Sequence, residues 1–192
     1  MKSVSTVLLV PGLFNSGPEH WQSLWEANHP EYQRVQQSDW VTPRCADWVR
    51  TLDASIHRVG LPVVLVGHSS ACAAIAHYAA QHGDGGGRVA AAFLGAPSDV
   101  EAPTYPAGPT GFGPMPPQKL PFRSVVVAST DDPFVTIERA EFFARCWGSR
   151  LIKIAGAGHI NTASVNTASG FGRWPEGEEW LRQLSENRTT VA

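Results

Sequence analysis

Short apolar runs alternate along the chain with longer stretches in which apolar residues recur every three or four positions. Short runs rich in Val, Leu and Ile are typical of buried strands, and the longer period indicates amphipathic helices. The predicted strands are 4–10, 32–37, 61–66, 89–94, 124–128 and 151–154. The predicted helices are 19–28, 45–59, 70–82, 137–147 and 176–184. This alternation predicts a doubly wound α/β fold: a roughly six-stranded, mostly parallel sheet with helices on both faces.

Two segments interrupt the alternation. Residues 97–121 contain eight prolines, which exclude a helix interior and a central strand. Because this segment follows a predicted strand, at the edge where α/β sheets bind ligands, we expect a loop over the site. Residues 160–164 and 165–169 form a near-repeat, Ile-Asn-Thr-Ala-Ser and Val-Asn-Thr-Ala-Ser, which is too short for a repeat architecture and is interpreted as a duplicated loop.

Length and composition fit a single domain that spans residues 1–192. The chain is 43% hydrophobic and 17% charged, an ordinary globular balance. Its net charge of −2 gives no electrostatic reason to expect nucleic acid or an anionic membrane as a partner. The apolar run at 7–10 is too short for a signal peptide or a membrane span, and three widely spaced cysteines do not predict a disulfide framework. We therefore expect a cytoplasmic protein with free thiols.

Residues 67–71 read Gly-His-Ser-Ser-Ala, directly after a predicted buried strand and at the start of a predicted helix. A nucleophile elbow, usually G-x-S-x-G, requires this context, because its tight turn holds the serine in a strained conformation at the carboxyl edge of the sheet. The residues two positions before and after the serine must be small, as Gly67 and Ala71 are around Ser69. Ser70 has larger residues at those positions. An ordinary strand–helix junction with a serine N-cap is the alternative, but we predict Ser69 as the nucleophile.

A serine nucleophile needs a base, which in this type of fold follows the serine and a carboxylate along the chain. His159 is the only histidine after residue 82, and it lies in a glycine-rich segment directly after the predicted strand 151–154. That position brings it to the same sheet edge as Ser69. A solvated loop histidine is the alternative, and His159 is the predicted base.

The carboxylate that orients the base is expected after the preceding strand, 124–128, where Asp131 and Asp132 follow. A proline follows Asp132 and favours an extended conformation for it, so Asp132 is the predicted partner of His159. It would fix the imidazole tautomer and stabilise the imidazolium. Asp131 is expected to cap the backbone or face solvent, and Asp99 is a third candidate.

Two backbone N–H groups are predicted to form an oxyanion hole. One belongs to Ser70, the residue after the nucleophile. The other belongs to Leu13, because Gly12 follows the first predicted strand and allows the chain to turn this N–H inward. A simple Pro-Gly turn is the alternative for that loop.

The candidate pocket residues are Asn15, His20 and Trp40. Asn15 and His20 lie near the first oxyanion loop, and Trp40 lies in a predicted loop after a strand. Trp21, Trp25, Trp48 and Trp147 occupy core-facing helical positions, where packing is their expected role. His57, His68, His77 and His82 lack the spacing to Asp, Glu or Cys that metal ligands show, so we expect no metal and no cofactor.

These residues together resemble the retinoblastoma-binding protein 9 family of small serine hydrolases, particularly its bacterial members. The resemblance covers nearly the whole chain. In chain order, its main motifs are Val10-Pro11-Gly12, His20-Trp21, Gln37-Ser38-Asp39-Trp40, Gly67-His68-Ser69-Ser70, Ala96-Pro97-Ser98-Asp99, Asp131-Asp132-Pro133-Phe134, Gly158-His159-Ile160-Asn161 and Trp174-Pro175-Glu176-Gly177. The resemblance implies an α/β-hydrolase fold without a separate lid domain, and a triad of Ser69, Asp132 and His159. Ala71 departs from the family pattern at the second elbow glycine.

The resemblance implies a small carboxylic ester as substrate, cleaved through an acyl-enzyme on Ser69. A chain of 192 residues leaves no room for a lid domain, which predicts a shallow pocket under residues 97–121 and favours small acyl groups. A thioesterase or an amidase would use the same triad. A non-catalytic binding or scaffold protein on this fold is the alternative from another class, and the three filled triad positions count against it.

Overall fold

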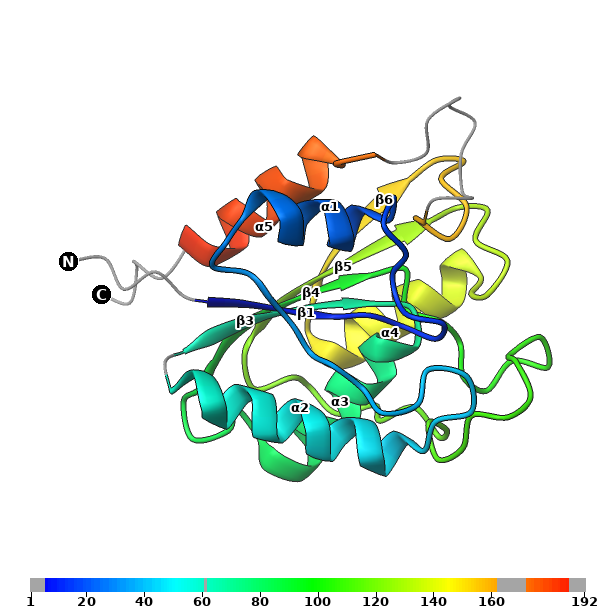
Figure 1. The fold of residues 1–192 in the computed structure, drawn as a ribbon. Helices are drawn as coiled ribbons and strands as arrows, with labels where there is room; N and C mark the ends of the chain where they lie inside the picture. Colours follow the sequence, from blue (N-terminus) through cyan, green and yellow to red (C-terminus); the bar gives the residue numbers. More distant parts are fainter. Residues whose placement is uncertain (1–5, 61, 162–171, 187–192) are drawn as a thin grey trace.

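The computed structural model describes residues 6–60, 62–161 and 172–186. These residues contain a six-stranded sheet with the order β2-β1-β3-β4-β5-β6 (Figure 1). Its strands are β1 (Thr6–Val10), β2 (Gln33–Arg34), β3 (Val63–His68), β4 (Val89–Gly95), β5 (Arg123–Ser129) and β6 (Arg150–Ile154). Each neighbouring pair is parallel, so the predicted doubly wound α/β sheet is confirmed, and the described part of it is parallel throughout.

Helices cover both faces of this sheet, as predicted (Figure 1). One face carries α1 (Trp21–Asn28) and α5 (Pro175–Glu186). The other carries α2 (Cys45–Val59), α3 (Ser70–His82) and α4 (Ile137–Trp147). No helix in the described ranges is long and apolar enough to cross a membrane.

Each strand divides its side chains between two cores because successive residues point to opposite faces. In β1, Leu8 and Val10 pack in the core under α2, α3 and α4, whereas Val7 and Leu9 pack in the core under α1 and α5. β3 is buried along its whole length, as expected for a central parallel strand. The helical tryptophans also join these cores: Trp21 and Trp25 lie on one face, and Trp48 and Trp147 on the other.

The predicted strand 32–37 is the element that the structure shortens most, because β2 has only two residues, at the edge of the sheet. The first part of the predicted strand 4–10, residue 61 and most of the near-repeat 160–169 lie outside the described residues.

The first part of the proline-rich segment 97–121 lies at the site, as predicted, and its residues Ser98, Tyr105 and Pro106 line a cavity there. The later part of the segment packs away from the site. The His77 Nε2–H donates to the Phe112 carbonyl at 2.8 Å, and the Trp147 indole N–H donates to the Pro116 carbonyl at 2.9 Å. Its buried apolar side chains include Val100, Phe112, Met115 and Leu120. These contacts hold the rest of the segment against the helices of the α2–α3–α4 face.

Candidate active site

Ser69 lies between the end of β3 and the start of α3, with φ 59° and ψ −129°. This strained conformation is the one a nucleophile elbow imposes. The Ser69 N–H donates to the carbonyl of Gly95, at the end of the neighbouring strand β4, at 3.0 Å. The loop after β1 approaches so closely that a Cβ on Gly12 would lie 2.7 Å from Ser69 Cβ and 2.9 Å from the His68 carbonyl oxygen. The sequence therefore needs glycine at position 12 for the two loops to meet.

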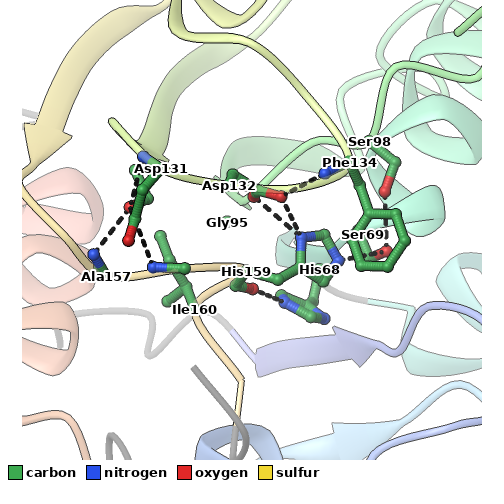
Figure 2. Close-up of polar contacts among 12 residues, drawn as sticks. His68, Ser69, Gly95, Ser98, Asp131, Asp132, Phe134, Ala157, His159 and Ile160 are labelled. Atoms are coloured by element: carbon green, nitrogen blue, oxygen red, sulfur yellow. Dashed lines mark hydrogen bonds and ion pairs between the residues drawn. The ribbon is translucent and has the colours of Figure 1, made fainter. Parts of the chain in front are cut away.

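The structure brings Ser69, His159 and Asp132 together at the carboxyl edge of the sheet (Figure 2). Ser69 Oγ lies 2.9 Å from His159 Nε2. His159 Nδ1 lies 2.9 and 3.0 Å from the two carboxylate oxygens of Asp132. The Asp132 side chain has no exposed surface, and the side chain of His159 is only 7% exposed.

This geometry sets the proton positions on His159. A carboxylate accepts hydrogen bonds, so the His159 Nδ1 carries a proton and donates it to Asp132. In the neutral imidazole Nε2 is then an acceptor, and it accepts from the Ser69 hydroxyl. The arrangement can remove the hydroxyl proton of Ser69 and can stabilise the imidazolium that results.

Asp131, the other aspartate after β5, holds the loop that carries the histidine. Its carboxylate accepts from the backbone N–H of Gly158 at 2.7 Å and from the hydroxyl of Ser129 at 2.6 Å. These two hydrogen bonds lower the pKa of the exposed Asp131 carboxyl. From the other side of the loop, the His68 Nε2–H donates to the His159 carbonyl at 2.9 Å.

Asp99 does not contact His159 and instead forms an ion pair. Its carboxylate accepts from Arg139 Nε and Nη2 at 2.7 and 3.0 Å. Its N–H donates to the Phe134 carbonyl at 2.9 Å, and the Phe134 N–H donates to Asp132 at 2.9 Å. Asp99 thus ties the loop after β4 to the loop that carries Asp132.

Leu13 and Ser70, the predicted oxyanion-hole residues, both line the cavity in front of Ser69. Neither N–H donates to a described carbonyl outside its own helix or strand, and Ser70, as the first residue of α3, has no acceptor within its helix. Both donors are thus available to an oxygen that develops negative charge near Ser69.

Two polar side chains hold the loop that contains Leu13. Arg34, on β2, donates to Asn15 Oδ1 at 2.8 Å. The fully buried amide of Gln22 donates to the carbonyls of Val10 and Val66, at 3.3 and 3.0 Å. These contacts connect the loop after β1 to the ends of β1 and β3, and they support a turn in which Asn15 adopts a left-handed φ of 62°.

A cavity of about 260 Å³ opens in front of Ser69. Asn15 and His20 line it, as expected, but Trp40 does not. The Trp40 ring packs edge-on against Trp48, with 5.7 Å between ring centroids, which draws it toward the core. The apolar part of the lining is formed by Leu13, Phe14, Tyr105, Pro106 and Phe134.

His20 and His68 bring two buried imidazoles to this cavity. Burial, reinforced by the charges of Arg34 and His159, lowers the pKa of His20 to about 3. Burial also lowers the pKa of His68 well below its usual range. The Nδ1 of His20 accepts from the Gln22 N–H at 3.2 Å and caps α1. Both imidazoles are therefore neutral at pH 7. None of the described residues that line the cavity is Asp, Glu, Lys or Arg.

A family model described as serine hydrolase matches residues 7–183. The chain belongs to the serine hydrolase family. A YdeN-like hydrolase from Pectobacterium atrosepticum is 32% identical, with 94% of this chain and 90% of that chain covered and a TM-score of 0.80.

Two more distant structures show the same fold. The ydeN gene product of B. subtilis is 16% identical, with 94% and 98% of the two chains covered and a TM-score of 0.66. A monoacylglycerol lipase from Paleococcus ferrophilus is 14% identical, with 94% and 92% covered and a TM-score of 0.64. With these neighbours and its six-stranded parallel sheet, the serine hydrolase has the α/β-hydrolase fold. No curated protein matches the chain.

Sequence reasoning missed three contacts of this serine hydrolase site. Ser98 Oγ lies 3.0 Å from Ser69 Oγ, His68 holds the carbonyl of His159, and the Phe134 ring packs against His159 with 4.7 Å between centroids. Ser98 had a detectable signal, because it follows the carboxyl end of a predicted buried strand, where side chains of neighbouring strands meet. Phe134 had none beyond its place in the Asp-Asp-Pro-Phe motif.

The described residues contain no group of three or more His, Cys, Asp or Glu side chains that could hold a metal ion. The three cysteines are free, and Cys45 and Cys72 are buried. Burial raises the pKa of the Cys45 thiol to about 12, which keeps it protonated at pH 7.

Proposed function

We propose that this serine hydrolase cleaves small, uncharged carboxylic esters through an acyl-enzyme on Ser69. The observation that carries the proposal is the continuous hydrogen-bonded series from Ser69 Oγ through His159 to Asp132, built on a serine with strained elbow geometry. A non-catalytic binding or scaffold protein would not need Ser69 and Asp132 each to lie within 3.0 Å of a ring nitrogen of His159.

In the proposed ester hydrolysis, each residue of the site has a defined role in each step. Ser69 Oγ attacks the ester carbonyl carbon while its proton passes to His159 Nε2, and the carbonyl oxygen accepts from the N–H groups of Leu13 and Ser70. The imidazolium returns the proton to the departing alcohol. Water then loses a proton to His159 and attacks the acyl carbon, and Ser69 leaves with the proton that His159 returns. Asp132 stabilises the imidazolium in both halves of the reaction.

The cavity supports the choice of substrate class. Its volume of about 260 Å³ lies below the range of roughly 300–1,000 Å³ that is usual for drug-sized ligands, so it suits a short acyl group. Among the described residues its lining contains no Asp, Glu, Lys or Arg, which favours a neutral ester over a carboxylate or phosphate ester. A thioester or an amide could use the same residues. An ester is favoured over an amide because an alcohol is an easier leaving group than an amine, and over a thioester on the family resemblance alone.

We also propose that the chain belongs to the retinoblastoma-binding protein 9 family, and the motifs shared with that family support this assignment. The same proposal includes a single α/β-hydrolase domain that acts on a small molecule in the cytoplasm.

The test is a series of p-nitrophenyl esters, from acetate to dodecanoate, hydrolysed by the wild type and by Ser69→Ala. We expect kcat/KM to be highest for the two- to four-carbon acyl groups and to fall with longer chains. Ser69→Ala should lose at least about 10⁴-fold in kcat. Matched thioesters and anilides test the alternative substrates. An enzyme that prefers dodecanoate, or a Ser69→Ala variant that keeps its activity, would contradict the proposal.

A further inference from the structure

Ser98 contacts the oxygen atom that is predicted to react. Its Oγ lies 3.0 Å from Ser69 Oγ, and the residue is only 3% exposed (Figure 2). The Ser69 hydroxyl has one proton, which it donates to His159 Nε2 at 2.9 Å. The Ser98 hydroxyl must therefore be the donor in the bond between the two serines.

The loop after β4 is built to hold Ser98 at this point. Ala96 has a left-handed φ of 46°, an uncommon conformation for a residue with a side chain, and its N–H donates to the Val127 carbonyl at 2.8 Å. On the other side of Ser98, the Asp99 carboxylate is held by two hydrogen bonds from Arg139. Ser98 is thus fixed between two anchored residues.

We propose that Ser98 is a further catalytic residue, whose hydroxyl donates to Ser69 Oγ and stabilises that oxygen as the leaving group when the acyl-enzyme is hydrolysed. The proposal rests on the function proposed above. In this step the bond between the acyl carbon and Ser69 Oγ breaks, and its electron pair goes to Oγ. The proton that reaches Oγ comes from His159 Nε2, and Ser98 keeps its own proton throughout.

The two halves of the reaction should need this hydrogen bond to different degrees. During acylation Ser69 Oγ donates electron density to the carbonyl carbon, so a hydrogen bond to Oγ gives little help. During hydrolysis of the acyl-enzyme Oγ gains negative charge, so the same bond becomes stronger in the transition state. An interaction accelerates a step only if it is stronger in the transition state than in the ground state.

A carbamate probe separates the two steps. With p-nitrophenyl dimethylcarbamate, release of nitrophenol reports transfer to Ser69, and loss of the adduct by intact mass reports its hydrolysis. Dimethylcarbamoyl adducts of serine hydrolyse slowly enough to follow. For Ser98→Ala we expect hydrolysis of the adduct to slow about tenfold, the effect of one lost hydrogen bond, while the transfer step changes less than about threefold. Ser98→Cys, with a weaker donor, should fall between Ser98→Ala and the wild type.

Ser124→Ala is the matched control. Ser124 is also a buried serine, and its Oγ lies 2.6 Å from Ser149 Oγ, but it lies near the start of β5, at the opposite edge of the sheet from Ser69. The Ser124→Ala variant should change neither the rate constant of transfer to Ser69 nor that of adduct hydrolysis. Thermal unfolding checks that each variant is folded.

An equal fall in both steps for Ser98→Ala, or no fall in either, would overturn the role of Ser98 and leave the proposed hydrolase function intact. A folded wild type that forms no carbamoyl adduct would overturn that function and the role of Ser98 with it.

Discussion

Asp131 and Asp132 are consecutive residues at the end of β5, yet the structure gives them different tasks. Asp132 is buried against the His159 ring, whereas Asp131 is exposed and accepts a backbone N–H of the histidine loop. The Asp132 carboxylate can thus stabilise the imidazolium charge, whereas the Asp131 carboxylate can only stabilise the conformation of the histidine loop.

Replacing each aspartate by asparagine separates these tasks. Asp132→Asn should lower kcat for p-nitrophenyl acetate by about 10³–10⁴-fold, because the amide favours the wrong imidazole tautomer. Asp131→Asn keeps an oxygen acceptor for the Gly158 N–H and should lose only a few-fold. A larger loss for Asp131→Asn than for Asp132→Asn would show that the wrong aspartate is assigned to His159.

At the scale of elements, the loop after β1 and the turn after β3 approach each other closely, and the proposed oxyanion hole requires this approach. Gly12→Ala tests this approach, because its Cβ would meet the backbone of the elbow. We expect a loss of at least about 10²-fold in kcat and of roughly 1–3 kcal/mol in the free energy of unfolding. Urea unfolding and ester hydrolysis measure the two effects.

Gly17→Ala is the control for stability, since a Cβ at position 17 would have no neighbour within 4 Å. Its free energy of unfolding should match the wild type. If Gly12→Ala is as stable and active as the wild type, the close contact between the two loops is wrong.

Hydrophobic patterning predicted the elements well because most of them bury one regular face. The strand β1 instead buries both faces, with Leu8 and Val10 in one core and Val7 and Leu9 in the other, and its continuous apolar run indicates this in the sequence. The path of residues 97–121 was not predictable, because tertiary contacts such as that between Phe112 and His77 fix it.

In the site, too, features with a local sequence signal were predictable, and features fixed by tertiary contacts were not. The positions of Ser69, His159 and Asp132 follow from local signals after strands, and the structure brings them together. The contact of Ser98 with Ser69 depends on β4 lying beside β3, which is a property of the sheet order. Trp40 was misplaced because its packing against Trp48 has no local signature.

For the whole molecule, the buried neutral imidazoles of His20 and His68 link stability to pH. The pKa of His20 in the folded state is about 3, below the value of about 6.5 for a free histidine. Above pH 6.5 both states are neutral at this residue. Between pH 6.5 and 3 the unfolded chain binds a proton that the folded protein excludes, so the free energy of unfolding falls as the pH is lowered.

The variant His20→Asn tests this link, since asparagine can still cap α1 but does not titrate. From pH 7 to pH 5 the wild type should lose stability faster than the variant, by up to about 1.4 kcal/mol per pH unit. Urea unfolding at several pH values measures both slopes. Equal slopes would contradict a buried, neutral His20.

The proposed function requires that the folded serine hydrolase holds one activated serine, Ser69. The most direct measurement is intact-mass analysis after treatment with a fluorophosphonate, followed by peptide mapping, for the wild type and Ser69→Ala. We predict a single phosphonyl adduct on Ser69 of the folded wild type and none on the variant. A folded wild type without an adduct, or an adduct on another residue, would contradict the claim.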